Sequence, residues 1–139
     1  MTLVTREDQN GIAILSLNRP DTLNALSPNL FVELREHVDA IANQTDTVGV
    51  VILRGEGRSF SAGNDLKAIE AGERAPSPHF QAETLDAIER LPQPVIAAVQ
   101  RIGAQVARGW QECALCHSPR GGPVAGTYEC PFGRGQGAL

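Results

Sequence analysis

The stretch Ser59-Phe60-Ser61-Ala62-Gly63-Asn64-Asp65-Leu66 lies between an apolar, β-branched run and a segment with helical character. Gly63 allows the backbone to come very close to another group. Peptide N–H groups exposed at such a turn can donate hydrogen bonds to an oxygen that gains negative charge during a reaction. The stretch therefore predicts one half of an oxyanion hole, and a second donor has to come from elsewhere.

The residues on both sides of this stretch predict parallel strands and helices. Val48 to Leu53 is a continuous apolar run that is typical of a parallel strand covered on both faces. On the other side, apolar residues at helical spacing from Phe80 to Leu91 predict a helix, and Val95 to Val99 predicts another buried strand. Strands that alternate with helices in this way indicate a parallel α/β sheet.

The N-terminal part predicts a hairpin and a long helix. Thr2 to Thr5 and Ile12 to Leu17 read as two strands, and Asn10-Gly11 favours the positive φ of a tight turn between them. Ser27-Pro28 is a favourable helix start, because serine caps the first turn and proline suits the first helical position. Apolar residues at helical spacing continue this helix to about Asn43.

Composition indicates one soluble globular domain. The 139 residues are 42% hydrophobic and 20% charged, and their net charge of -4 argues against a general nucleic-acid binder. No run approaches the roughly 18 apolar residues that cross a membrane, and the first residues lack the basic and apolar pattern of a leader. We therefore expect a cytoplasmic protein with no membrane partner.

Composition changes sharply near Gln100. Residues 1–99 hold 8 Lys and Arg against 14 Asp and Glu, whereas residues 100–139 hold four Arg and two Glu and contain all three cysteines. Breaker-rich segments in the second part show neither a strand nor a helix period, which favours loop or disorder. We therefore divide the chain into a folded part, 1–99, and a divergent tail, 100–139.

Four motifs in the folded part, in the expected order, resemble the crotonase family, also called the enoyl-CoA hydratase/isomerase superfamily. They are Asn18-Arg19-Pro20-Asp21-Thr22-Leu23-Asn24-Ala25-Leu26, Val50-Val51-Ile52-Leu53-Arg54-Gly55, Phe60-Ser61-Ala62-Gly63-Asn64-Asp65-Leu66 and Pro94-Val95-Ile96-Ala97-Ala98-Val99. The resemblance runs from about residue 3 to residue 99, which is the N-terminal half of the family's fold. It implies an incomplete ββα spiral of the α/β class.

The resemblance also implies a ligand and a site. Family members bind acyl-CoA thioesters, with coenzyme A as part of the substrate and no separate cofactor, and hold the thioester oxygen between two backbone N–H groups. One of these corresponds to the N–H of Asn64. The positions that correspond to CoA-contacting segments are Asp21, Thr22, Leu23, Ala62, Gly63, Asn64, Asp65 and Leu66, and Lys67 is placed to meet a phosphate. The alternative interpretation is purely structural, with Gly63 relieving crowding and Asp65 capping the next helix.

After Val99 the chain departs from the family pattern. The Gly-rich loop that carries the second N–H and the two catalytic glutamates of the hydratases have no match, and the later helices that mediate trimerisation in the family are absent. Glu112 lies about three residues from the position of the family's first glutamate, and Glu129 is the other carboxylate of the tail. Glu112 is a weak catalytic candidate, since an exposed charge is the simpler interpretation.

The tail allows three further interpretations. Its composition is what an out-of-frame reading of a GC-rich gene gives, so a frameshifted or truncated terminus is the interpretation we favour. Cys113-Ala114-Leu115-Cys116-His117 matches the C-x-x-C-H pattern of haem attachment. Cys113, Cys116, His117 and Cys130 also offer zinc ligands, although free thiols are the default in a reducing compartment and we assign no metal.

Three hypotheses of function follow. The first is an enoyl-CoA hydratase/isomerase family enzyme of fatty-acid metabolism that acts on acyl-CoA thioesters, truncated relative to the family. The second is a non-catalytic remnant that binds CoA. The third is a metal- or haem-binding module built on Cys113, Cys116 and His117.

Overall fold

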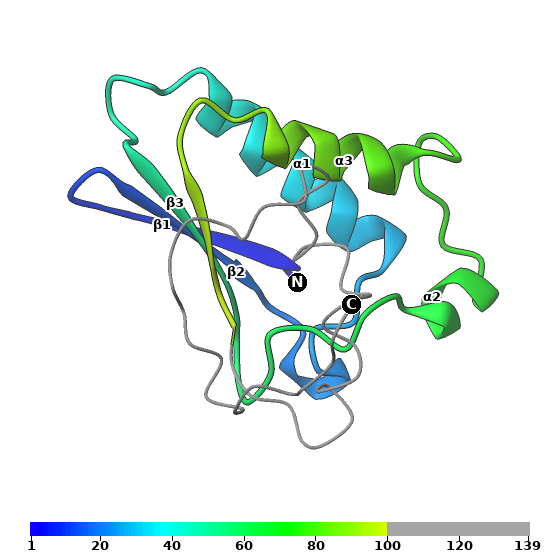
Figure 1. The fold of residues 1–139 in the computed structure, drawn as a ribbon. Coiled ribbons are helices and arrows are strands. Elements are labelled where there is room, and N and C mark those ends of the chain that lie inside the picture. The colour runs from blue at the N-terminus through cyan, green and yellow to red at the C-terminus, as the bar shows by residue number, and fades with distance from the viewer. Residues whose placement is uncertain (100–139) are drawn as a thin grey trace, which may run out of the picture.

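The computed structural model describes residues 1–99, which form a four-stranded mixed sheet with two helices stacked on one face (Figure 1). In chain order the elements are β1 (Val4–Gln9), β2 (Ile12–Leu17), the 3₁₀ turn η1 (Pro20–Thr22), α1 (Pro28–Ala42), β3 (Val50–Gly55), α2 (Leu66–Glu70), α3 (Phe80–Glu89) and β4 (Val95–Ala98). The strands lie side by side in the order β1-β2-β3-β4. The α/β class expected from the sequence is confirmed.

The first two strands form the predicted antiparallel hairpin. Pairing runs from Val4 opposite Leu17 to Gln9 opposite Ile12. Asn10 and Gly11 have φ values of 50° and 80°, as a two-residue turn of this hand requires. The first strand begins and ends later than the predicted Thr2 to Thr5, because ladder hydrogen bonds hold its polar residues as firmly as its apolar ones.

Helix α1 begins and ends where the sequence predicts. The Ser27 hydroxyl accepts a hydrogen bond from the Leu30 N–H at 3.2 Å, and Pro28 occupies the first turn. Helix α1 also contacts the start of β1. One carboxylate oxygen of Glu33 accepts hydrogen bonds from the N–H groups of Leu3 and Val4 at 2.7 and 2.9 Å. Helix α1 is therefore capped by the residue before it and hydrogen-bonded to the start of β1.

Strands β2, β3 and β4 run parallel, as the alternation of strands and helices predicts. The expectation that β3 is buried on both faces is only half met. Val51 and Leu53 are buried against the helices, whereas Val50 and Ile52 on the other face are half-buried. On β4 the side chain of Ile96 is 40% exposed.

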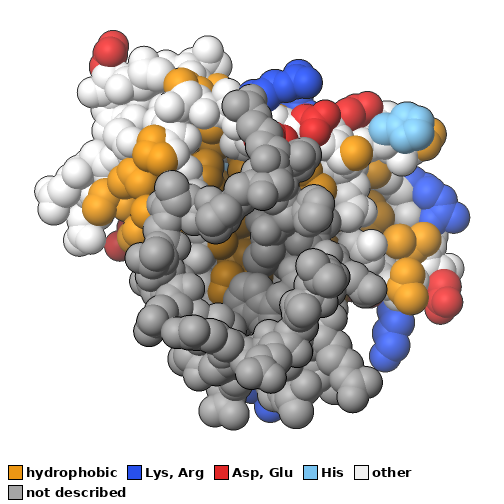
Figure 2. Space-filling view, viewed as in Figure 1, with side chains coloured by type: hydrophobic (Ala, Val, Ile, Leu, Met, Phe, Trp, Pro, Cys, Tyr) orange, Lys and Arg blue, Asp and Glu red, His pale blue; other side chains and the backbone are white. Residues whose placement is uncertain are grey.

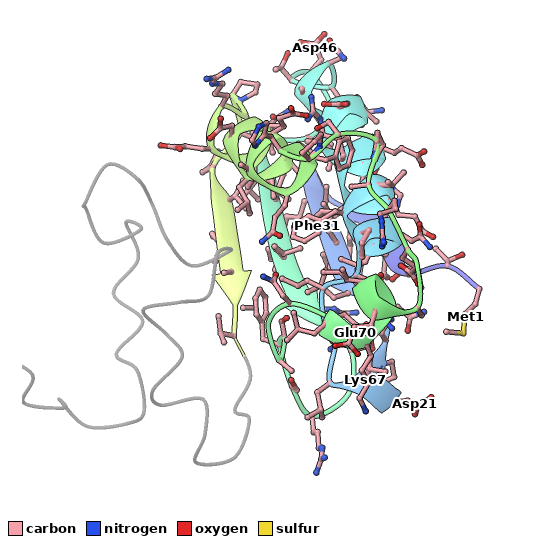
Figure 3. The ribbon with its side chains drawn as sticks, turned by 90° about the vertical axis from the view of Figure 1, so that its right-hand side faces the viewer. Met1, Asp21, Phe31, Asp46, Lys67 and Glu70 are labelled. Carbon is pink, nitrogen blue, oxygen red and sulfur yellow. The ribbon has the colours of Figure 1, made fainter. Side chains whose placement is uncertain are left out.

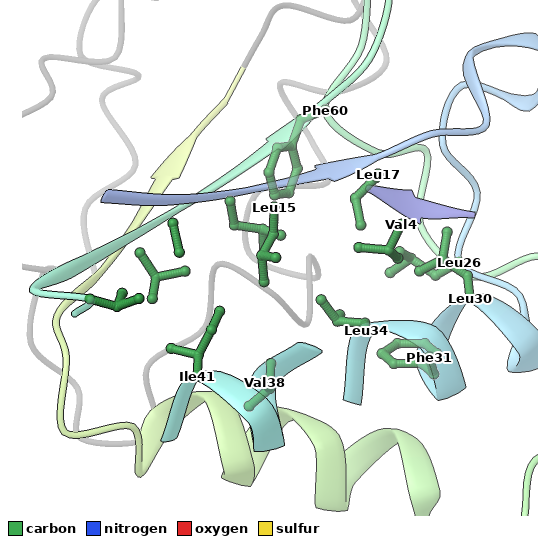
Figure 4. Close-up of a cluster of buried hydrophobic side chains, with 14 residues drawn as sticks. Val4, Leu15, Leu17, Leu26, Leu30, Phe31, Leu34, Val38, Ile41 and Phe60 are labelled. Atoms are coloured by element: carbon green, nitrogen blue, oxygen red, sulfur yellow. The ribbon is translucent and has the colours of Figure 1, made fainter. Parts of the chain in front are cut away.

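The core lies between the sheet and α1, and α3 packs on the outer side of α1 (Figure 4). Fourteen buried hydrophobic side chains contribute to it, from both hairpin strands, β3, α1 and the loops that follow: Val4, Ala13, Leu15, Leu17, Leu26, Leu30, Phe31, Leu34, Val38, Ile41, Val48, Val51, Leu53 and Phe60. Leu26 and Phe60 extend this core into the two loops that carry the family-like motifs, so packing holds those loops in place.

Helix α2 contributes no residue to this core. Ala68 is its buried residue, whereas Leu66 and Ile69 are 66% and 43% exposed. Figure 2 shows hydrophobic side chains at the surface on the α2 side of the molecule. None of the helices in residues 1–99 has the length and apolar character needed to cross a membrane.

Candidate functional site

The loops that follow β2 and β3 meet at one end of the molecule. Strand β2 leads into η1, and β3 leads through the motif at 59–66 into α2. Figures 1 and 3 place η1 and α2 at this end, with Asp21 and Lys67 labelled there and Asp46 at the opposite end. Ligands of parallel α/β sheets bind outside the carboxyl ends of the strands, so this end is the candidate site.

A short parallel bridge between Leu26 and Asn64 joins the two loops. The Leu26 N–H donates to the Gly63 carbonyl at 2.8 Å, and the Asp65 N–H donates to the Leu26 carbonyl at 3.0 Å. These bonds use the neighbours of Asn64 and leave its own peptide groups on the other edge of the segment, because successive residues of an extended chain point in opposite directions.

The main-chain N–H of Asn64 is therefore not used by the bridge that fixes it. Among residues 1–99, no group accepts a hydrogen bond from it. A donor held rigidly on both sides yet without an acceptor is what stabilisation of a developing oxyanion requires. The predicted role of Asn64 stays a prediction, and this geometry is compatible with it.

Gly63 is required for its backbone conformation rather than for close approach within the described chain. Its φ is +91°, and a Cβ at this position would meet no atom of that part of the protein within 4 Å. Its N–H donates to the Ser61 hydroxyl at 3.1 Å, and that hydroxyl donates to the Asn24 carbonyl at 2.9 Å. The turn is held from one side, and on the other side no residue in 1–99 lies against Gly63.

Asn24 is the buried centre of the loop after β2. It is fully buried with φ of 54°, a conformation that asparagine tolerates better than most residues. Its side-chain oxygen accepts from the Arg19 N–H at 2.8 Å, and its side-chain nitrogen donates to the carbonyls of Glu56 and Ser59 at 2.9 and 2.7 Å. One side chain thus fixes η1 against the loop that follows β3.

An ion pair between Arg19 and Asp65 completes the connection. A guanidinium nitrogen of Arg19 lies 2.7 Å from Asp65 Oδ2 and also donates to the Ala25 carbonyl at 2.6 Å. Asp65 Oδ1 accepts from the Ala68 N–H at 3.0 Å and so caps α2. The Ala68 N–H, followed by the Arg19 guanidinium, lowers the pKa of the Asp65 carboxyl below its ordinary value.

The structural interpretation of Asp65 as a helix cap is thus confirmed. Its side chain and its N–H are both engaged within the chain. We infer that any contribution of Asp65 to a ligand site is indirect, through the position of its neighbour Asn64.

The predicted CoA-contacting residues at this end of the molecule differ in their exposure and in whether their N–H groups are already hydrogen-bonded. Asp21 and Thr22 in η1 are exposed, and so are Ala62, Leu66 and Lys67. The N–H groups of Thr22 and Leu23 are already bonded to the carbonyls of Arg19 and Pro20. The Lys67 ammonium pairs with none of the carboxylates described in residues 1–99.

An open groove of about 440 Å³ adjoins Asn64. Leu26 and Phe31 contribute apolar walls, Ile69 comes from α2, and the segment from Glu73 to Pro78 forms another side. Gln81, in the first turn of α3, also lines it and donates from Nε2 to Asn64 Oδ1 at 3.2 Å. The motif thus borders a space of the size that small organic groups occupy.

The remaining candidates fall outside the described residues. These are Glu112 and Glu129, together with Cys113, Cys116, His117 and Cys130. Within residues 1–99 no group of three or more His, Cys, Asp and Glu side chains is arranged to hold a metal ion. The domain division at residue 99 and the interpretation of the tail as a frameshift stay predictions.

Sequence reasoning did not assign roles to Arg19, Asn24 and Gln81. Arg19 and Asn24 belong to one of the four family-like motifs. Polar residues in a short turn after a strand often hydrogen-bond to the backbone, so a structural role could have been predicted for them. Gln81 gave none, since its partner Asn64 is 17 residues away and they meet only in the folded chain.

Comparison with known proteins places these features in a family. Residues 7–116 match the family model described as enoyl-CoA hydratase/isomerase, so the match extends past Val99. Enoyl-CoA hydratase domain-containing protein 3 of Danio rerio is 35% identical over 119 residues, which cover 83% of this chain and 40% of that protein. Ethylmalonyl-CoA decarboxylase of Mus musculus is 38% identical over 96 residues, which cover 66% of this chain and 30% of that protein.

Solved structures agree. A Legionella pneumophila structure, described as an enoyl-CoA hydratase/isomerase of the crotonase type, superimposes with a TM-score of 0.64 at 29% identity, over 72% of this chain and 40% of that one. The chain spans about two fifths of the length of such relatives. The arrangement of sheet, α1 and motif is therefore a partial crotonase-like fold, and this chain belongs to the enoyl-CoA hydratase/isomerase family, the crotonase superfamily.

Proposed function

We propose that this protein binds an acyl-CoA thioester, with the thioester carbonyl oxygen accepting a hydrogen bond from the main-chain N–H of Asn64. The observation that carries the proposal is the Leu26–Asn64 bridge, which fixes this N–H while leaving it without an acceptor in residues 1–99. Family membership supports the choice of ligand.

The chemistry of the N–H follows from charge. When a proton leaves the carbon next to a thioester, negative charge develops on the carbonyl oxygen. A donor already in place stabilises that charge without reorganising, and loss of one such donor costs roughly 3–4 kcal/mol in the transition state. Arg19, Asn24 and Ser61 maintain the loop conformation that holds this N–H in position.

The reaction, if any, that follows thioester binding is not part of this proposal. The relatives are named for hydratase and decarboxylase chemistry on CoA thioesters, so the shared feature that supports this proposal is thioester binding. An active enzyme and a non-catalytic CoA-binding protein are the two forms of the proposal, and turnover distinguishes them.

The test compares Asn64→Pro with Asn64→Ala in the full chain. Proline removes the N–H, whereas alanine keeps it and removes only the side chain. We expect Asn64→Pro to lose turnover of crotonyl-CoA by a factor of about 10² or more, if the wild type is active, and otherwise to weaken calorimetric binding of butyryl-CoA. Circular dichroism checks that both variants fold.

Two results would count against the proposal. Wild-type protein that binds neither thioester would exclude it, and equal binding and turnover by a folded Asn64→Pro variant would exclude the role of the N–H. Binding without turnover in the wild type would favour the non-catalytic form.

A phosphate contact of Lys67 belongs to the same proposal. Lys67→Gln removes the charge at an exposed position of α2 and is expected to weaken binding of butyryl-CoA but not of butyryl-pantetheine, which lacks the nucleotide phosphates. Equal weakening for both ligands would refute the phosphate contact.

A further inference from the structure

The turn between β1 and β2 places an asparagine before a glycine at the surface of the protein. Asn10 and Gly11 are both exposed, and β2 runs from this turn to η1, so the turn lies at the opposite end of the sheet from the candidate site (Figure 1). The peptide nitrogen that follows an asparagine can attack the side-chain carbonyl of that asparagine. Glycine hinders this attack least, because it has no Cβ.

Main-chain hydrogen bonds separate Asn10 from the other asparagines. The sequence contains six asparagines, all within residues 1–99. At five of them the N–H of the following residue donates a hydrogen bond, so its nitrogen can attack only after that bond breaks. The acceptors are Asn24 Oδ1 after Asn18 (2.8 Å), the Thr22 carbonyl after Asn24 (3.1 Å), Ser27 Oγ after Asn29 (3.2 Å), the Ile41 carbonyl after Asn43 (2.9 Å) and the Leu26 carbonyl after Asn64 (3.0 Å).

The N–H of Gly11 differs from these five. No group in residues 1–99 accepts a hydrogen bond from it, and the Asn10 side chain makes no hydrogen bond within the same residues. The Gly11 carbonyl, in contrast, accepts from the N–H groups of Gly49 and Val50 at 2.8 and 3.4 Å. The turn is therefore held to the start of β3 through its carbonyl, while its peptide nitrogen is uncommitted.

We propose that Asn10 is a site of spontaneous deamidation, with water as the co-reactant. The Gly11 nitrogen forms a bond to Asn10 Cγ, the bond from Cγ to Nδ2 breaks, and Nδ2 leaves as ammonia with the proton that the Gly11 nitrogen gives up. Water then opens the cyclic imide. Hydrolysis at Cγ gives aspartate, and hydrolysis at the main-chain carbonyl carbon gives isoaspartate, in which the chain continues through the side-chain carbons.

The isoaspartate product does not fit this turn. It adds one methylene group to the backbone between Asn10 and Gly11, and the length of a hairpin turn fixes the register of its strands. The pairing of Gln9 with Ile12 and the hydrogen bonds to the Gly11 carbonyl both depend on that length. Deamidation should therefore loosen this end of the sheet. It is independent of acyl-CoA binding, since the candidate site lies at the other end of β2.

The test incubates the full chain at mildly alkaline pH, once folded and once unfolded in urea, and measures conversion at each asparagine by peptide mapping and mass spectrometry. Asn43 is the matched control, because it is also exposed but the next N–H is bonded. We expect unfolding to accelerate conversion of Asn43 about tenfold or more, and that of Asn10 less than about threefold, because only the first must open a hydrogen-bonded turn before it reacts. If unfolding accelerates both equally, or Asn10 does not convert in the folded protein, the inference is wrong.

A variant tests the structural consequence. Asn10→Gly removes the reactive side chain and keeps a residue pair that suits the turn. Amide hydrogen exchange at Gly49 and Val50 should become faster in aged wild-type protein and stay slow in aged Asn10→Gly, with exchange in the motif at 59–66 unchanged in both. Unchanged exchange at Gly49 and Val50 in wild-type protein that carries isoaspartate at position 10 would refute the loosening of the sheet.

Discussion

Replacing Asp65 by asparagine removes the charge that faces Arg19 but keeps an oxygen able to cap α2. The two side chains are only 17% and 10% exposed, so water compensates little for the lost partner. Breaking a fully buried pair costs about 3–5 kcal/mol, and for this nearly buried pair we expect about 2–3 kcal/mol of unfolding free energy. Asp65→Ala also removes the cap and should cost about 1 kcal/mol more.

The assay is urea unfolding of the full chain, followed by far-UV circular dichroism at pH 7. The matched control is Asp39→Asn, which removes the carboxylate of the exposed Arg35–Asp39 pair on α1. Those side chains are 30% and 58% exposed, so we expect a change below about 0.5 kcal/mol. Equal, small changes in Asp65→Asn and Asp39→Asn would refute the argument that burial strengthens the Arg19–Asp65 pair.

The same substitution has a pH dependence of known sign. The pKa of Asp65 is lowered in the folded protein by the Ala68 N–H and by Arg19. A lowered pKa stabilises the fold above the unfolded value of about 3.9, and that stabilisation is lost as the pH falls through the folded value. The stability difference between wild type and Asp65→Asn should therefore shrink as the pH is lowered from 5 towards 3. A constant difference would contradict the assigned cause.

Three further substitutions test the scaffold by urea unfolding. Asn24→Ala removes three hydrogen bonds from a buried position and should cost about 3–4 kcal/mol, whereas a loss below about 1 kcal/mol would show that the loops hold without it. Gly55→Ala places a methyl group against the Ser59 and Phe60 carbonyls and should cost about 1–3 kcal/mol, and wild-type stability would refute the close approach. Ser27→Ala removes the α1 cap and should cost about 1 kcal/mol, and unchanged stability would refute the cap's contribution.

Much of the fold could be predicted because its signals are local. Asn10-Gly11 specified the hairpin turn, and Ser27-Pro28 specified the start of α1. The first strand was placed too early because Arg6 to Gln9 are polar, and a strand edge that faces solvent carries no hydrophobic signal. The second face of β3 was expected to be buried because a continuous apolar run does not reveal how well each face is covered.

The site could be predicted less well, since it depends on contacts between distant residues. The motif located Asn64, but the bridge to Leu26 that fixes it spans two loops. Gly63 was expected to allow a close approach, whereas within residues 1–99 no atom crowds it and its positive φ is what favours glycine. The partnership of Arg19 with Asp65, 46 residues apart, is a product of tertiary structure and leaves no periodic pattern in the sequence.

The two outermost strands of the described sheet differ in chemistry. β1 presents Arg6, Glu7 and Asp8 in succession, and charged side chains along a border discourage another chain from pairing with it. β4 is composed of Val95, Ile96 and two alanines, with no charge to repel a neighbour. Growth of the sheet by added strands, whether from the same chain or from another molecule, is consequently directional: the β1 border resists it and the β4 border admits it.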